Sequence, residues 1–190
     1  MPTPEDVNRF WLEEVGPKGW YAKDDALDAT IRDRFVDLWE EALANGLHDW
    51  LTKPRCTLAY IILTDQFPRN MFRESPRAFA TDRLARAASK RAIERGWDLR
   101  VEEPERQFFY MPLMHSECLT DQDRCVRLML TRMPRTGADN LLHAKVHREV
   151  IREFGRFPFR NAALSRGGSA DERAFVEQGG YGRMLEELRA

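Results

Sequence analysis

The segment PRCTLAYIILTDQFPRN, from Pro54 to Asn70, dominates the expected fold. Apolar side chains cover nearly every side of a helix that begins at about Pro54 and ends at about Gln66, so this helix is expected to be central. Proline disfavours the α conformation in the residue before it, so Phe67 is expected to end the helix and fold back into the core. The segment therefore predicts a central helix followed by a Phe-Pro corner.

Residue patterns on both sides of this segment also indicate helices. Thr3 before Pro4 is typical of an N-cap, and Thr120 and Ser169 each precede an acidic residue three positions later, as in a capping box. Besides the central helix, the predicted helices cover approximately residues 4–15, 24–45, 82–95, 104–115, 120–133, 139–154, 170–177 and 182–189. No segment has the alternation of a strand. We predict an all-α fold of about eight or nine helices in a single domain, residues 1–190.

The Phe-Pro corner has a second copy about ninety residues later. The letters FPRN at Phe67–Asn70 recur as FPFRN at Phe157–Asn161, and RAF recurs at Arg77–Phe79 and Arg173–Phe175. Each copy follows an apolar helix and precedes another, and each phenylalanine is expected to be buried. The pattern predicts an internal pseudo-repeat of helix, corner, polar loop and helix.

Composition excludes several classes of protein. The chain of 190 residues has 30 basic and 31 acidic residues and a net charge of −1, so no global attraction to nucleic acid is expected. The longest apolar run, residues 58–64, is far shorter than the roughly 18 residues that a membrane span needs. The N-terminus lacks a signal peptide, and the 3 cysteines have no paired spacing. We expect a soluble cytoplasmic protein with no nucleic-acid or membrane partner; its oligomeric state stays open.

Three long motifs carry a resemblance to a known family. They read LAYIILTDQFPRNMFRESPRAFATD, RQFFYMPLMHSE and HREVIREFGRFPFRNAALSR, and they lie in this order between Leu58 and Arg166. Together they resemble the bacterial family catalogued as domain of unknown function 924 (DUF924), and compatible spacing on either side extends the likeness to nearly the whole chain. The resemblance implies an all-helical, tetratricopeptide-like array of helical hairpins. It brings no activity and no catalytic residues.

Asp65 is the most informative single residue of the central helix. Its position continues the apolar row of that helix, so the carboxylate is expected to point inward, and it lies in the last turn, where the helix dipole disfavours negative charge. A buried carboxylate needs a partner, and the guanidinium fork of arginine fits best. We predict a salt bridge from Asp65 to Arg69, Arg73 or Arg160.

Histidine side chains are the other ionisable groups that are expected to point into the protein. His147 lies on an apolar helix face, where a hydrogen-bonded core histidine is more common than a ligand-binding one. His143 and His147 are spaced i, i+4, as in some metal sites, but no H-E-x-x-H motif surrounds them and a third ligand would have to be His115 or Glu117. The sequence therefore predicts neither a metal nor another cofactor.

Two functions from different classes remain open. In the first, the corners meet near the turn that contains His115, and an interhelical pocket binds a small anionic ligand through arginine, with His115 or His147 and Glu117 as candidate acid and base. The predicted pocket residues are Asp65, Arg69, Arg73, Tyr110, His115, Glu117, His147, Arg156 and Arg160. In the second, the helices form a scaffold that binds a protein or an acidic peptide without catalysis. Whether the protein is an enzyme stays open.

Overall fold

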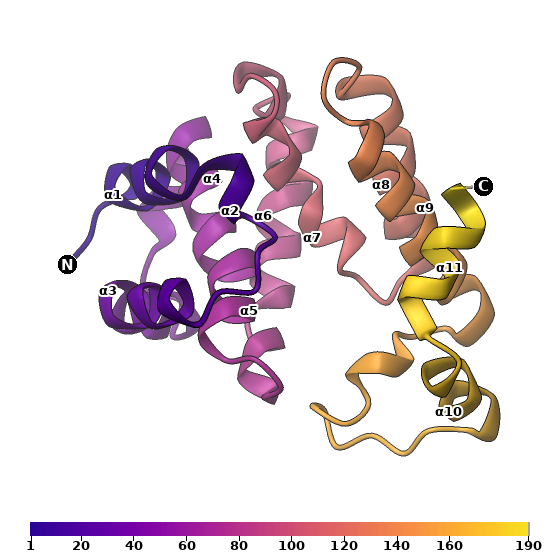
Figure 1. The fold of residues 1–190 in the computed structure, drawn as a ribbon. Helices are drawn as coiled ribbons and strands as arrows, with labels where there is room; N and C mark the ends of the chain where they lie inside the picture. Colours follow the sequence, from indigo (N-terminus) through magenta and orange to yellow (C-terminus); the bar gives the residue numbers. More distant parts are fainter. Residues whose placement is uncertain (190) are drawn as a thin grey trace. The chain divides into compact units, whose positions relative to one another are not determined.

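The computed structural model describes residues 1–189, and every regular element in that range is a helix (Figure 1). No strand occurs there, which confirms the all-α prediction. The chain forms two compact units, Met1–Pro112 (unit 1) and Leu113–Ala190 (unit 2). The single-domain interpretation stays a prediction.

Unit 1 begins with a nearly unbroken helical run. It comprises α1 (Pro4–Asn8), the π-helical η1 (Arg9–Val15) and α2 (Gly16–Gly19), and α3 (Asp25–Leu43) follows. Thr3 and Asp6 form the predicted capping box, in which the Thr3 amide donates to Asp6 Oδ2 at 2.9 Å and the Asp6 amide donates to Thr3 Oγ1 at 3.3 Å. These two bonds satisfy amides that have no partner inside a helix.

The central helix of unit 1 continues through the first Phe-Pro pair. It consists of α4 (Pro54–Ile61), the π-helical η3 (Ile62–Gln66) and α5 (Phe67–Met71). Phe67 has φ −58° and ψ −39°, so the prediction that it ends the helix is wrong. The Phe67 amide bonds the Ile62 carbonyl five residues back, and Pro68 has no amide to offer the Thr64 carbonyl. The buried Thr81 Oγ1 donates to that carbonyl instead, at 2.6 Å.

Phe67 lies at the centre of an aromatic core in unit 1. Its burial confirms the prediction made from the sequence. Its side chain is fully buried, and its ring centroid lies 4.9 Å from that of Phe35, 5.5 Å from Trp11 and 5.9 Å from Phe10. Such tilted and edge-on pairs add to the burial energy of the rings. This core fastens the central helix to the N-terminal run and to α3.

The rest of unit 1 packs against the central helix through small side chains. The helix α6 (Asp82–Glu94) buries Ala85, Ala88 and Ala92 and contacts α4. The region predicted as a helix over 104–115 is instead the 3₁₀ turn η6 (Glu105–Phe109) and the short α7 (Met111–Met114). The remaining short elements of unit 1 are η2 (His48–Thr52), η4 (Pro76–Phe79) and η5 (Asp98–Arg100), whereas α7 includes the last residues of unit 1 and the first of unit 2.

Unit 2 is built on a helical hairpin. Its helices α8 (Leu119–Arg132) and α9 (Ala138–Phe154) lie side by side, and η7 (Pro158–Arg160), α10 (Ala170–Glu177) and α11 (Gly180–Arg189) follow (Figure 1). Ser169 and Glu172 form the predicted capping box. The one predicted at Thr120 is wrong, because the N-cap of α8 is Cys118 and makes no side-chain hydrogen bond.

The second Phe-Pro pair begins outside a helix, because α9 ends before it. Gly155, in the left-handed conformation with φ 70°, closes α9, and Phe157 is extended with φ −91° and ψ 105°, as expected before proline. Phe157 is fully buried with Val150, Ile151 and Phe175. The two copies of the motif thus differ in backbone conformation, and the pseudo-repeat and the tetratricopeptide-like arrangement stay predictions.

Candidate functional site

Asp65 is fully buried and pairs with Arg69, which confirms the predicted salt bridge. Arg69 Nη1 lies 3.5 Å from Asp65 Oδ1 and 2.5 Å from the Asp65 carbonyl oxygen, and the same guanidinium lies 2.9 Å from Asp82 Oδ1. Burial by itself would lower the pKa of Arg69, but the charges of Asp65 and Asp82 outweigh it and raise this pKa. The guanidinium therefore joins the central helix to the first turn of α6.

Arg73 pairs with a carboxylate of α3. Its guanidinium binds Asp28 with two nitrogens, with Nη2 2.9 Å from Oδ1, and Asn70 Nδ2 donates to the same oxygen at 2.8 Å. Desolvation opposes ionisation of the buried Asp28, yet the bonds from Arg73 and Asn70 prevail and lower its pKa. Arg73 and Asn70 thus fasten the end of α5 to α3.

Tyr110 is the fourth predicted pocket residue in unit 1. It is fully buried, and its hydroxyl donates to Asp98 Oδ2 at 2.6 Å. This bond meets the need of a buried phenol for a partner.

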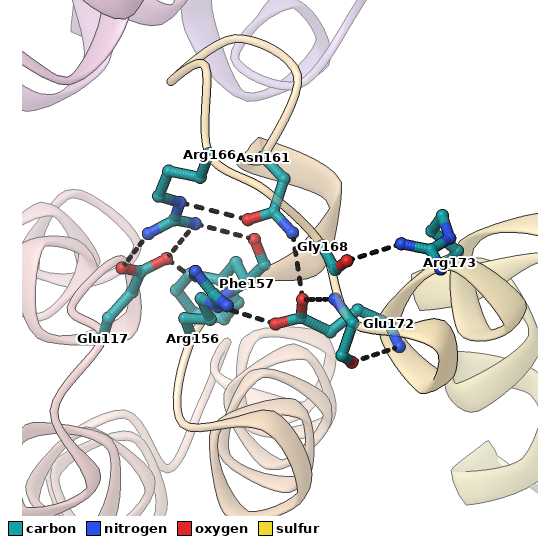
Figure 2. Close-up of polar contacts among 9 residues, drawn as sticks. Glu117, Arg156, Phe157, Asn161, Arg166, Gly168, Glu172 and Arg173 are labelled. Atoms are coloured by element: carbon teal, nitrogen blue, oxygen red, sulfur yellow. Dashed lines mark hydrogen bonds and ion pairs between the residues drawn. The ribbon is translucent and has the colours of Figure 1, made fainter.

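Glu117 of unit 2 holds the second Phe-Pro segment in place. One carboxylate oxygen accepts from the Phe157 amide at 2.9 Å, and Arg166 binds both oxygens at 2.7 and 2.9 Å (Figure 2). Arg166 also donates to the Phe157 carbonyl at 3.1 Å and to Asn161 Oδ1 at 3.1 Å. Desolvation would raise the pKa of Glu117, but these bonds lower it, so the carboxylate is ionised at neutral pH.

Arg156 forms the second ion pair of this segment. Its Nε donates to Glu172 Oε1 at 2.6 Å, and the other Glu172 oxygen accepts from the Ser169 amide at 2.7 Å (Figure 2). The pair ties the end of α9 to the start of α10. Sequence reasoning named Glu117 and Arg156 but missed Arg166 and Glu172, although Arg166 closes the third family motif and Glu172 belongs to a predicted capping box.

His147 and Arg160 both contact the Phe157 ring. The Arg160 guanidinium lies 4.4 Å from the ring centroid, and the His147 ring meets it edge-on at 5.4 Å. His147 Nδ1 lies 2.8 Å from the His143 carbonyl oxygen, so it carries the proton and donates, which leaves Nε2 as an acceptor. The pKa of His147 is lowered to about 3, chiefly by desolvation; the hydrogen bond to the His143 carbonyl opposes this shift, and the positive charges of His115, Arg160 and His143 add to it.

Tyr181 of α11 completes an aromatic and histidine cluster that the sequence did not predict. Its ring lies 4.9 Å from that of His147, and its hydroxyl bonds His143 Nδ1 at 2.5 Å. The His115 ring lies 6.3 Å from that of His147. Only the i, i+4 spacing of His143 and His147 signalled this cluster in the sequence.

The nine predicted pocket residues divide between the units. Unit 1 contains Asp65, Arg69, Arg73 and Tyr110, and unit 2 contains His115, Glu117, His147, Arg156 and Arg160. Their meeting in one pocket stays a prediction. Across residues 1–189, no three side chains of His, Cys, Asp or Glu are grouped so that they could hold a metal ion.

Residues 7–180 match the family described as bacterial protein of unknown function DUF924. The chain belongs to this family. Membership in DUF924 confirms the resemblance carried by the three motifs. The solved structure of the protein of unknown function ATU0120 from Agrobacterium tumefaciens is similar to this DUF924 chain, with a TM-score of 0.86 and 40% identity over 93% of this chain and 97% of that one. No curated protein matches the sequence.

No helix within residues 1–189 is both long and apolar enough to cross a membrane. This agrees with the short apolar runs of the sequence.

Proposed function

We propose that unit 2 binds a small anionic ligand beside His147. The observation that carries the proposal is the set of charges acting on this imidazole. Arg160 contributes a permanent positive charge, and His115 and His143 add positive charge only when they are protonated. A desolvated place with a positive potential attracts anions, because little water screens the charge there.

The chemistry of the groups suits a carboxylate or a phosphate. Arg160 is 8% exposed and its guanidinium lies over the Phe157 ring, and arginine is the side chain whose geometry best matches a carboxylate or a phosphate. His147 is neutral above about pH 3 in the absence of a ligand. An anion at Nε2 would favour the protonated ring and raise this pKa, so anion binding should strengthen as the pH falls.

The other predicted site residues suit the proposal as supports rather than as ligand contacts. Arg69, Arg73 and Arg156 each bind a carboxylate of their own unit, which reduces what they can offer an anion. Both Glu117 oxygens accept hydrogen bonds around Phe157, so Glu117 positions the segment that carries Arg160. Proton transfer, if a reaction takes place here, is assigned to His115 and His147.

The first experiment is native mass spectrometry of the protein purified from its own cells. We expect a copurifying small anion that is released on unfolding. Thermal unfolding with added phosphate or succinate then measures protection directly, because a ligand that binds only the folded state raises the midpoint. An acidic peptide in the same assay tests the scaffold alternative.

Matched variants connect the protection to Arg160. Arg160→Gln should abolish protection by the anion, whereas Arg152→Gln removes an arginine of α9 that is half exposed and should leave protection unchanged. The quantity compared is the midpoint shift caused by the anion, so a general loss of stability does not mimic the effect. Protection that is equal in both variants, or absent from the unmodified protein, would contradict the proposal.

A further inference from the structure

We infer that unit 1 holds a separate pocket that binds a small aromatic carboxylate. The pocket has a volume of about 160 Å³ and is lined by residues of η2, α4 and α6 and by Trp97. All of its lining residues belong to unit 1, so the site is independent of the one proposed beside His147. None of them belongs to the nine residues predicted from the sequence.

The size and the lining of the pocket favour one ring. Its walls include Leu51 of η2, Leu84 and Ala88 of α6, and the indole of Trp97. A protein cavity of about 150 Å³ with apolar walls is known to hold benzene. Ala88 is one of the small side chains through which α6 packs against α4. A larger side chain at this position would fill the pocket.

Tyr60 gives the pocket a polar group without a protein partner. The residue is 5% exposed and lines the pocket, yet its hydroxyl makes no hydrogen bond to any residue that the structure describes. The hydroxyl oxygen is not one of the buried polar atoms that lack a partner, so it is open to solvent and can donate to a ligand in the pocket. Burial also raises the pKa of Tyr60, so the phenol keeps its proton at neutral pH.

Two arginines supply the charge. Arg91 of α6 and Arg95, the C-cap residue of that helix, line the pocket on the same side as Leu84 and Ala88, and both are exposed at its rim. Neither forms an ion pair with the residues described, although the Arg95 guanidinium lies 4.8 Å from the centroid of the Trp97 ring. Like charges at i, i+4 repel each other, and a bound anion would relieve this repulsion.

These features together define the ligand class. The apolar walls take the ring, the exposed guanidinium groups at the rim take a carboxylate, and Tyr60 can bond a polar substituent on the buried end of the ring. The last turn of a helix disfavours an anion, but two full positive charges exceed the half charge of the helix terminus. A benzoate with a 4-hydroxyl group combines all three features.

Isothermal titration and amide NMR spectra of the full chain test the inference with four probes: benzoate, 4-hydroxybenzoate, benzyl alcohol and acetate. We expect benzoate to bind at low millimolar concentration or tighter and to shift resonances of η2 and α6. Acetate lacks the ring and benzyl alcohol lacks the charge, so each should bind about tenfold more weakly or worse.

Three variants assign the contacts. The double variant Arg91→Gln/Arg95→Gln should weaken benzoate binding about tenfold or more and leave benzyl alcohol binding unchanged. Its control, Arg83→Gln/Arg100→Gln, removes two exposed arginines that do not line the pocket and should bind benzoate normally. Tyr60→Phe should weaken 4-hydroxybenzoate binding but not benzoate binding.

Several results would overturn the inference. They are no benzoate binding at millimolar concentration, equal benzoate affinity in the two double variants, and benzyl alcohol binding as tightly as benzoate. Resonance shifts confined to unit 2 would place benzoate elsewhere and would also overturn the pocket, while leaving the site beside His147 untouched.

Discussion

The two Phe-Pro segments have nearly the same letters but different backbones. Phe67 stands inside a continuous helix in the α conformation, whereas Phe157 is extended after a helix that Gly155 has closed. Both phenylalanines are fully buried. A short motif can therefore fix which side chain enters the core without fixing the path of the chain around it.

The partners of the backbone groups explain this difference. In the first segment the Phe67 amide bonds the Ile62 carbonyl in a π turn, and the Thr81 hydroxyl bonds the Thr64 carbonyl, which Pro68 leaves without a helical partner. In the second segment Glu117 and Arg166 bind the amide and the carbonyl of an extended Phe157. Because buried backbone groups must be paired, the neighbouring elements select the conformation of each copy.

The largest effects are expected from removing the two rings. Phe67→Ala and Phe157→Ala should each lower the free energy of unfolding by about 3–5 kcal/mol, because each leaves a cavity among packed rings. Urea unfolding measures both. Phe159→Ala, at a side chain that is 42% exposed, is the control and should change stability by less than about 1 kcal/mol. A small loss for only one of the buried rings would show that the two copies are not equivalent in packing.

Thr81→Val should have the next largest effect, and only on the first segment. The substitution keeps the shape of the side chain but leaves the buried Thr64 carbonyl and the Trp39 indole N–H without their hydroxyl partner. We expect a loss of about 2 kcal/mol in urea unfolding. Thr81→Ser retains the hydroxyl and should lose less. An unchanged stability of the valine variant would mean that the π turn alone sustains the helical Phe67.

A pH dependence should distinguish the second segment, because His147 packs on Phe157. The pKa of His147 in the folded state, about 3, lies below its ordinary value of 6.5, so between these values the unfolded chain binds a proton that the folded chain does not. Stability should fall as the pH decreases through this window, by at most about 1.4 kcal/mol per pH unit.

His147→Asn isolates this contribution, since the asparagine amide can still donate to the His143 carbonyl but does not titrate. Urea midpoints at several pH values for both proteins give the slopes. The variant should have the shallower slope below pH 6.5, and identical slopes would contradict the assigned pKa of His147.

The smallest effect is expected at Gly155. Its φ of 70° lies in the left-handed region, and a Cβ there would meet no atom within 4 Å, so Gly155→Ala should cost about 1 kcal/mol through backbone strain alone. Gly167→Ala is the matched control, because Gly167 has equal space and no positive φ. Thermal unfolding of the two variants gives the difference, and equal midpoints would show that the end of α9 does not depend on glycine.

The sequence by itself determined the features that depend on neighbours within one or two helical turns. It predicted the all-α class, the ends of α6 and α9 to within about a residue, the caps at Thr3 and Ser169, and the burial of Phe67 and Phe157. The pairing of Asp65 with Arg69 was among its alternatives, because a buried carboxylate needs a partner, and the two residues lie one turn apart. Periodicity, capping and i, i+4 pairing are local, so they can be read from the letters.

The tertiary structure alone decided the partners that lie far apart in the chain. Arg166 reaches Glu117 across 49 residues, and Thr81 reaches the Thr64 carbonyl from another helix. The pocket of Tyr60, Leu84 and Trp97 likewise depends on how α4 and α6 pack. The rule that proline excludes the α conformation before it failed at Phe67 for the same reason. The local preference against the α conformation at Phe67 is overcome because packing and hydrogen bonds to distant residues stabilise the helical conformation by more free energy.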